Sequence, residues 1–489
     1  MPKVSPHGGT GAPWDGANSP SSAPAARRSL RAAGVAAAFA SVLCGQQAAR
    51  VKPLPVIKSP LEAGISPAFR SLGPSQTAQF TAVFESGASW SLSAPIGAIS
   101  LDGLYSAPAQ IASPQTLSIT ARSLSDPAVT ARASVTLLPS AQLTLRQAAG
   151  GRVLMGAAAE AGELPWVPDP LQDEAYAATL GAQYSMLSPE NALKWPIVHP
   201  SPDAYNFTFG DEIVAFAKDR AIQVRGHNLC WYMDNPGWLT DFALTASPAD
   251  MAQRLQSHIQ TVVGHYRGQV FAWDVVNEAV SDAATGIGTD LRDSLWYNQP
   301  GIGLSGTGYI EQAFRWARAA DPDALLFYND YGIEDAGPKF EAVYQMVRDF
   351  VVRGVPIDGV GMEMHLDTTG YPSTAGLTEN IQRLTGLGLQ VHITEMDVRL
   401  PVDGNGDASA LDLQAEAQTY QRILGVCLAV PGCTALQTWG FSDAHSWIPQ
   451  YYPGFGEALP FDGNYGAKPA FRALIETLQT PAALRAPTY

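Results

Sequence analysis

Apolar runs and amphipathic segments alternate along the C-terminal two thirds of the chain. Eight runs rich in Val, Ile, Leu and Ala predict buried strands, at 153–159, 184–188, 223–229, 271–277, 325–330, 359–365, 391–397 and 436–440. Apolar residues recur every three or four positions between these runs, which predicts helices at 212–221, 251–266, 309–320, 339–354 and 415–430. The predicted fold is therefore α/β, a (β/α)8 TIM barrel over 145–480. A doubly wound open sheet is the alternative, but no Gly-rich phosphate loop follows the first strand.

Residues 65–140 have a different pattern. Short stretches of alternating apolar and polar residues are separated by Pro and Gly turns, and basic residues are sparse. This spacing predicts a small all-β sandwich. The stretch 97–108 resembles a motif of bacterial immunoglobulin-like domains. Such a domain serves either as a spacer or as a carbohydrate-binding module, for which Trp90 and Tyr105 are the candidate ring platforms.

The N-terminus predicts a disordered leader with an export signal at 1–50 and a Pro-rich linker at 51–64. A basic group at 27–31 precedes an apolar stretch that is too short to span a bilayer. We therefore expect a secreted or periplasmic bacterial protein without a transmembrane segment. Lipid anchoring at Cys44 is less favoured, because Leu43 occupies a position that normally holds a small residue.

Composition narrows the choice of partner. The chain has 489 residues, is 46% hydrophobic and carries a formal net charge of -15. This acidic balance argues against nucleic acid, because phosphate requires a basic surface. A neutral polysaccharide is compatible with it, and a monomer is expected.

Four cysteines occur in the chain. Cys427 and Cys433 flank a short loop and predict a local disulfide in an exported protein. Cys230 is expected to be a buried free thiol. No Cys or His cluster has the spacing of metal ligands, so neither a metal nor another cofactor is expected.

Polar and aromatic side chains follow seven of the eight predicted strands, at the end that faces the active site in barrel enzymes. Rings, amides and carboxylates in such a place predict a sugar-binding cleft. In strand order these residues are Glu190, Asn191 and Lys194; His227 and Trp231; Asn277 and Glu278; Asn329 and Tyr331; Glu363 and His365; Glu395 and Asp397; Trp439 and Trp447. Two of them, Glu278 and Glu395, each end an apolar strand, which favours paired-carboxylate chemistry, most commonly glycoside hydrolysis.

The same region resembles glycoside hydrolase family 10, the β-1,4-xylanases. The matching motifs, in family order, are SPENALKW, VRGHNLCW, WDVVNEA, NDYG, GVGMEMHL, HITEMDV, TWGFSDAHSWIP and FDGNYGAKPAF. The resemblance implies a secreted endo-β-1,4-xylanase that hydrolyses xylan and xylo-oligosaccharides by a retaining double displacement. Glu278 would be the general acid/base and Glu395 the nucleophile. A related β-1,4-glucanase and a catalytically weakened carbohydrate-binding barrel remain alternatives.

Supporting roles also follow from the resemblance. His365 would orient the nucleophile, with Asp397 fixing the imidazole. Asn277 would hydrogen-bond the sugar 2-hydroxyl. The remaining positions are assigned to substrate binding: Glu190, Asn191, Lys194, His227 and Trp231 on the non-reducing side, and Asn329, Tyr331, Trp439 and Trp447 elsewhere in the cleft.

One position departs from the family pattern. The family usually has Gln two residues before His365, but this chain has Glu363. A third carboxylate beside Glu278 and Glu395 is electrostatically unfavourable. Glu363 is expected to stay protonated and mimic the amide, to raise the pKa of Glu278, or to reduce activity. We predict an active enzyme whose pH–rate profile changes in Glu363→Gln; superimposable profiles would contradict this.

Overall fold

The computed structural model describes residues 64–66, 69–84, 86–113, 115–139, 143–163, 169–286 and 290–480. The leader, Cys44 and most of the linker lie outside these residues, so the export and anchoring expectations remain predictions. No helix among the described residues is long and apolar enough to cross a membrane.

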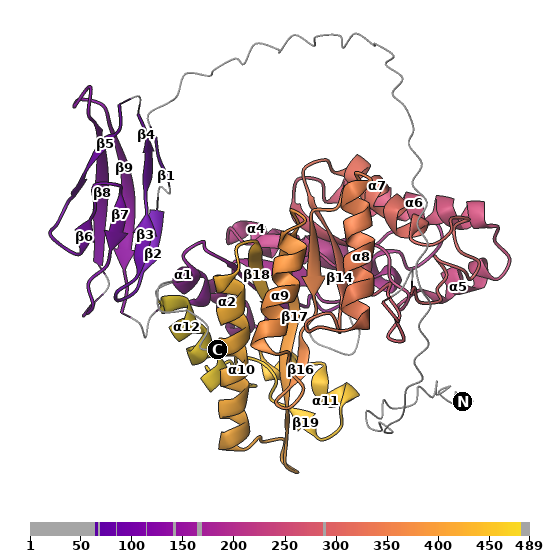
Figure 1. Ribbon diagram of the computed structural model, residues 1–489. Coiled ribbons are helices and arrows are strands. Elements are labelled where there is room, and N and C mark those ends of the chain that lie inside the picture. Colours follow the sequence, from indigo (N-terminus) through magenta and orange to yellow (C-terminus); the bar gives the residue numbers. More distant parts are fainter. Residues whose placement is uncertain are drawn as a thin grey trace, which may run out of the picture. The chain divides into compact units, whose positions relative to one another are not determined.

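Eight parallel strands form a closed barrel (Figure 1), and each overlaps one of the predicted apolar runs. The open-sheet alternative is wrong, because the last strand pairs with the first: Leu154 lies opposite Ala435. The strands are β10 (Leu154–Ala159), β11 (Met186–Pro189), β12 (Gln223–Gly226), β13 (Val270–Asn277), β14 (Leu325–Asp330), β15 (Gly359–Met362), β17 (Gln390–Pro401) and β18 (Cys433–Thr438).

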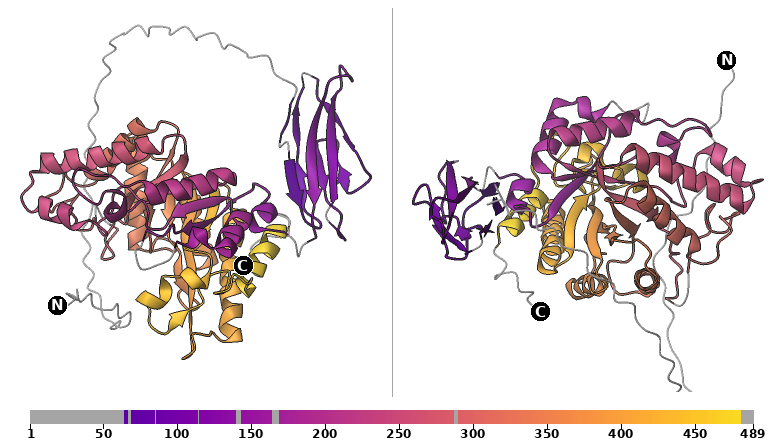
Figure 2. Two further views of the ribbon diagram at one scale, coloured as in Figure 1. Left: turned by 180° about the vertical axis from the view of Figure 1, so that it is seen from behind. Right: turned by 90° about the horizontal axis from the view of Figure 1, so that it is seen from above.

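Helices lie around the outside of these strands (Figure 2), each burying one apolar face. In α6 the Ser247 side chain accepts from the Asp250 N–H at 3.2 Å and caps the first turn, while Met251, Leu255 and Ile259 are buried along one face. The five predicted helices are confirmed. The main helices are α2 (Glu174–Gln183), α4 (Thr208–Asp219), α6 (Pro248–His265), α7 (Gly308–Ala320), α8 (Pro338–Val352), α9 (Thr374–Thr385), α10 (Ala410–Ala429) and α12 (Pro469–Gln479).

Shorter helical pieces fill the connections between these elements. They are α1 (Leu145–Ala149), η2 (Pro170–Gln172), α3 (Trp195–Val198), α5 (Gly237–Ala243), η3 (Asp443–His445) and α11 (Ile448–Tyr451).

The sixth and seventh strands differ from their predicted extents, and the difference shapes the mouth of the barrel. β15 ends at Met362, and the chain resumes as β16 (His365–Asp367) alongside the extended end of β17. β17 continues to Pro401, where it also pairs with β19 (Phe455–Gly456). Glu363 therefore lies in the break between two strands rather than within one.

The residues before the barrel form an all-β region. Strands β2 (Phe69–Leu72), β9 (Thr130–Leu137), β8 (Gln115–Ser123) and β5 (Ala88–Leu92) make one sheet; β3 (Thr77–Gln79), β7 (Leu104–Ser106) and β6 (Ala98–Ile99) make another; and β1 (Gly64–Ser66) pairs with β4 (Thr81–Val83). Phe80, Tyr105, Ile119 and Val135 belong to one buried apolar cluster. Because the Tyr105 ring is fully buried, it is not available as a sugar platform.

The predictions for Cys427, Cys433 and Cys230 are confirmed. Cys427 in α10 and Cys433 at the start of β18 form a disulfide with a Cα–Cα distance of 5.1 Å. Cys230 is a buried free thiol. The disulfide ties a helix to the amino end of β18, away from Trp439 after its carboxyl end.

Candidate active site

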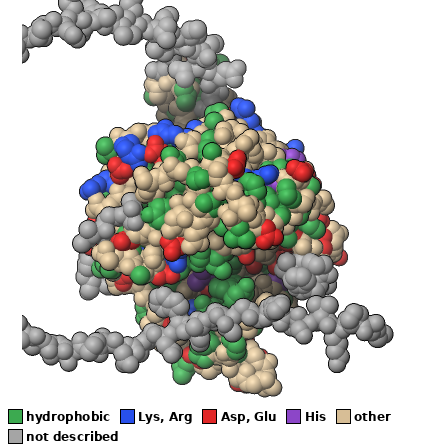
Figure 3. Space-filling model, turned by 90° about the vertical axis from the view of Figure 1, so that its right-hand side faces the viewer, with side chains coloured by type: hydrophobic (Ala, Val, Ile, Leu, Met, Phe, Trp, Pro, Cys, Tyr) green, Lys and Arg blue, Asp and Glu red, His purple; other side chains and the backbone are tan. Residues whose placement is uncertain are grey.

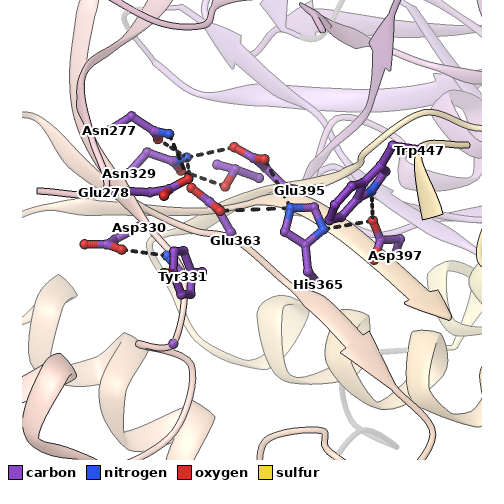
Figure 4. Close-up of polar contacts among 12 residues, drawn as sticks. Asn277, Glu278, Asn329, Asp330, Tyr331, Glu363, His365, Glu395, Asp397 and Trp447 are labelled. Atoms are coloured by element: carbon purple, nitrogen blue, oxygen red, sulfur yellow. Dashed lines mark hydrogen bonds and ion pairs between the residues drawn. The ribbon is translucent and has the colours of Figure 1, made fainter. Parts of the chain in front are cut away.

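The carboxyl end of β13 places Glu278 at the mouth of the barrel (Figure 4). Its φ is +51°, a left-handed conformation that is uncommon for a residue with a side chain, so the chain turns sharply after the strand. The Glu278 N–H donates to the Asn329 carbonyl at 2.8 Å, which holds this turn against β14. Asn277 Nδ2 donates to Glu278 Oε1 at 3.2 Å.

Burial raises the pKa of Glu278 to about 8, and the negative charges of Asp330 and Glu395 add to the rise. Trp231 and Arg292 partly oppose it. The carboxyl therefore keeps its proton at neutral pH, as a general acid must.

Glu395 lies within β17 and is held from both sides. Asn329 Nδ2 donates to its Oε1 at 2.9 Å, and His365 Nε2 lies 3.3 Å from its Oε2. The residue is 5% exposed, so its carboxyl is oriented by protein groups rather than by solvent. These two bonds fix the direction in which the carboxyl oxygens point.

Asp397 orients the His365 ring. Its Nδ1 lies 2.8 Å from Asp397 Oδ2, and Trp447 Nε1 donates to the same oxygen at 2.8 Å. Burial alone lowers the pKa of His365, but the charges of Asp397 and Glu395 outweigh it and raise the pKa well above its usual value. The imidazole is then protonated on both nitrogens and donates to both carboxylates.

The side-chain amide of Asn329 hydrogen-bonds to several of these groups. Its Nδ2 donates to Asn277 Oδ1 at 2.8 Å and to the Oε1 atoms of Glu363 and Glu395 at 2.9 Å each, while its Oδ1 accepts from Thr394 at 2.7 Å. The residue was expected to bind substrate. The structure instead places it fully buried with its amide engaged by the protein, so it is a supporting residue.

Glu363 is the third carboxylate of the site. It is 2% exposed, and its Oε2 lies 3.9 Å from His365 Nε2. Burial raises its pKa well above the usual value, and the charges of Glu395 and Glu278 raise it further. The structure thus favours the expectation that this carboxyl stays protonated at neutral pH.

Most of the residues predicted to bind substrate on the non-reducing side of the cleaved bond are neighbours in the structure. Lys194 Nζ donates to Asn191 Oδ1 at 3.0 Å and lies 5.4 Å from the centre of the Trp231 ring. Glu190 is buried beside Lys194, and burial together with the charge of Glu160 raises its pKa well above normal. The structure brings these residues together.

His227 is more deeply buried than we expect of a side chain whose main role is to contact substrate. It is 2% exposed, and its Nδ1 lies 3.1 Å from Asp274 Oδ2. Asp274 also accepts from Arg225 Nε at 3.1 Å, in a buried charged pair that the sequence patterns did not indicate. Trp439 packs edge-on against His227, with ring centres 5.0 Å apart.

Next to Glu278, Tyr331 belongs to a charged network rather than to an open sugar platform. Its hydroxyl donates to Asp282 Oδ2 at 2.7 Å, and Lys339 Nζ lies 3.5 Å from the centre of its ring. Lys339 also pairs with Asp330 at 2.9 Å, and Arg292 Nη1 donates to Asp282 at 2.9 Å. Asp330 directly follows Asn329 at a strand end and was recognisable as a candidate, whereas Arg292 and Lys339 come from a loop and a helix without a motif.

Charged side chains are spread over the face of the molecule shown in Figure 3. On the face in Figure 3, acidic side chains are scattered among hydrophobic and polar ones, and the basic side chains do not form a patch that covers the face. The formal net charge of the chain is -15.

A (β/α)8 barrel in which one buried glutamate follows a strand and a second lies within the extended seventh strand is typical of a class of carbohydrate-cleaving enzymes. A profile of the family described as Glycosyl hydrolase family 10 matches residues 144–477. The chain belongs to this family.

Individual relatives agree. The chain is 41% identical over 306 residues to endo-1,4-β-xylanase B of Thermotoga neapolitana. The matched region is 63% of this chain and 84% of that protein. The crystal structure of xylanase 10B from Thermotoga maritima is similar with a TM-score of 0.63 and 40% identity, covering 69% of this chain and 98% of that one. Xylanase 10B from Thermotoga petrophila, solved with xylobiose, matches with the same TM-score, identity and coverage.

Proposed function

We propose that this chain is an endo-β-1,4-xylanase that cleaves internal bonds of xylan with retention of anomeric configuration. One observation carries the proposal: two buried glutamates share a site but have different surroundings. Glu278 has a pKa of about 8 and holds a proton, whereas Glu395 accepts hydrogen bonds from an amide and from a protonated imidazole. This is the division of labour that a retaining glycosidase requires.

In the first step Glu278 gives its proton to the glycosidic oxygen as the C1–O bond breaks, and Glu395 forms a covalent bond to the anomeric carbon. The charge of Glu395 is lost in this ester, which removes one of the causes of the raised Glu278 pKa. Glu278, now ionised, takes a proton from water as that water attacks C1 and the ester bond from C1 to Glu395 breaks, which restores the Glu395 carboxylate. The sugar leaves with its original configuration, and Glu278 is protonated again.

Asn277 supports the glycosyl-transfer step. Its Oδ1 accepts from Asn329 and its Nδ2 donates toward Glu278, so the amide is fixed next to the acid. In this position it is suited to hydrogen-bond the 2-hydroxyl of the sugar, an interaction that strengthens in the oxocarbenium-like transition state.

Xylan is proposed as the substrate because the related proteins named above are xylanases and one of them was solved with xylobiose. Asn191, Lys194 and Trp231 supply the hydrogen-bonding and stacking groups of such a cleft. A glucan differs by a hydroxymethyl group on every sugar. Comparing the rates on xylan and on soluble cellulose tests this choice, and a faster rate on cellulose would indicate the β-1,4-glucanase instead.

The direct test is reducing-sugar release from xylan by the wild type, Glu395→Ala and the control Glu379→Gln, which changes an exposed carboxylate on α9. We expect the wild type and the control to be active and Glu395→Ala to lose nearly all activity. Activity in Glu395→Ala would contradict the assignment of Glu395 as nucleophile, whereas no activity in the wild type would contradict the enzyme and favour a carbohydrate-binding role. Proton NMR of the first product should show the β-anomer before it equilibrates.

For the remaining parts of the chain, we propose an export signal within 1–50 and an immunoglobulin-like domain at 65–140 that acts as a spacer. Two sheets around one apolar cluster support the domain assignment. Fractionation of the expressing bacterium, with Cys44→Ala as control, tests secreted or periplasmic location against lipid anchoring. Sedimentation of the purified protein tests the expected monomer.

A further inference from the structure

Three side-chain atoms that could act as metal ligands lie close together at the mouth of the barrel (Figure 4), one each from Glu363, His365 and Glu395. His365 Nε2 lies 3.3 Å from Glu395 Oε2 and 3.9 Å from Glu363 Oε2. The three side chains offer ligand atoms that all lie within 4.8 Å of one another. Zinc binds nitrogen and carboxylate oxygen at roughly 2.0–2.2 Å in a tetrahedron, which places neighbouring ligand atoms about 3.3 Å apart. Small side-chain movements would therefore bring all three atoms onto one ion.

The other polar atom of each side chain is already held by the protein. Asn329 Nδ2 donates to Oε1 of both Glu363 and Glu395, at 2.9 Å each. His365 Nδ1 is bonded to Asp397 Oδ2 at 2.8 Å. These bonds leave both Oε2 atoms and Nε2 turned toward one another. A carboxylate behind a histidine and hydrogen bonds behind carboxylates are the outer contacts that orient metal ligands.

Glu363 itself has an unused oxygen. It is 2% exposed, and only its Oε1 accepts a hydrogen bond from the described residues. Its Oε2 faces the His365 imidazole without one. Its contact there is a long one, 3.9 Å from Oε2 to His365 Nε2, and a cation between the two atoms would bind both more closely.

We propose that Glu363, His365 and Glu395 form a binding site for a divalent transition-metal ion, with Zn²⁺ as the ion that fits best. Two carboxylates balance its charge, and the imidazole nitrogen favours Zn²⁺ over Mg²⁺ or Ca²⁺, which prefer more ligands and oxygen alone. Water completes the tetrahedron. The bound ion occupies Oε2 of Glu395 and so inhibits the enzyme; this consequence, unlike the binding itself, rests on the proposed function.

Binding is tested by isothermal titration of tag-free, EDTA-treated protein with ZnCl₂, at about pH 8 because metal must displace protons from its ligands. We expect one bound ion per protein molecule in the wild type and in the control Glu379→Gln. Glu363→Gln exchanges an anionic ligand for a neutral amide of the same shape and is expected to weaken binding at least about tenfold. Circular dichroism verifies that each variant is folded.

The proposal is overturned if the wild type takes up no Zn²⁺, or if Glu363→Gln binds it as tightly as the wild type. Inhibition is measured separately, as the ratio of xylan hydrolysis with ZnCl₂ to that with EDTA in each variant. We expect a ratio well below one for the wild type and closer to one for Glu363→Gln. Since titration requires no substrate, failure to bind metal and failure to hydrolyse xylan are distinct outcomes.

Discussion

Asn329 Nδ2 lies 2.9 Å from Oε1 of Glu395, so a buried amide at the end of β14 holds the candidate nucleophile of β17. The same nitrogen serves Glu363 Oε1 and Asn277 Oδ1. An amide nitrogen has two hydrogens, so three acceptors share them. One side chain thereby sets the positions of two carboxyls and of the amide next to the acid.

Replacing this amide should damage both activity and stability. Asn329→Ala leaves three acceptors without their donor and the Thr394 hydroxyl without its acceptor; each unsatisfied buried group costs about 1–3 kcal/mol. We expect a lower melting temperature and a kcat reduced by roughly a hundredfold, as when one preorganised hydrogen-bond donor is removed. Calorimetry and xylan kinetics measure the two effects. Asn405→Ala, on an exposed loop, should change neither; a wild-type kcat in Asn329→Ala would show that the amide does not position the site.

The proposed role of Glu278 predicts a dependence on the leaving group. An aryl xyloside with an acidic phenol needs no proton to depart, whereas a sugar hydroxyl does. Glu278→Ala should therefore lose xylan hydrolysis by a factor on the order of a thousand while forming the covalent intermediate from 2,4-dinitrophenyl xyloside at a rate near that of the wild type. Glu395→Ala should lose both reactions. Equal losses on the two substrates in Glu278→Ala would contradict the assignment.

The barrel could be predicted from the sequence because its strands are buried on both faces and read as continuous apolar runs. The helices could be predicted because each buries a single face. The break between β15 and β16 could not, since no Gly or Pro stands at the interruption, Glu363 and Met364, to mark it in the sequence. Whether Glu363 lies in a strand or in a break is decided by pairing with β17, which is a tertiary contact.

Within the site, the residues at strand ends could be predicted and the partners from elsewhere could not. Glu278 and Glu395 stand out because each is a carboxylate at the end of an apolar run in the sequence, although the structure extends the strand of Glu395 to Pro401. Arg292 and Lys339 resemble ordinary surface charges until the fold brings them to Asp282. Asn329 was recognised by position but assigned to the wrong contact, because a pattern shows that a residue lies near the site and not which way its amide is used.

The raised Glu278 pKa predicts the alkaline limit of activity. The acid works only when protonated, so kcat/KM should fall as pH rises through about 8. After burial, the charge of Asp330 is the largest cause of the raised pKa, so Asp330→Asn should move this fall to lower pH. Asp349→Asn, an exposed change on α8, is the control. Kinetics between pH 5 and pH 10 give both profiles, and an unmoved alkaline limb in Asp330→Asn would be the contrary result.

The disulfide should stabilise the barrel without affecting catalysis. Cys427 and Cys433 close a short loop at the amino end of β18, and a cross-link over so few residues contributes about 2 kcal/mol by limiting the unfolded chain. The double variant Cys427→Ala/Cys433→Ala should melt a few degrees lower and keep its kcat. Cys230→Ala, which removes a buried free thiol, controls for the lost sulfur atoms. An unchanged melting temperature would show that the bond adds no stability.

The last prediction concerns Glu363→Gln, which replaces a carboxyl by an amide. The pH dependence of kcat/KM is measured with EDTA present. At neutral pH the buried Glu363 carboxyl is protonated, and at higher pH it adds a third negative charge beside Glu395 and Glu278. That charge opposes ionisation of Glu278 and so helps it keep its proton. Glu363→Gln never develops the charge, and its kcat/KM should therefore begin to fall at lower pH than in the wild type, while the acidic limb changes less. Superimposable alkaline limbs would mean that Glu363 does not ionise in the range where the enzyme works.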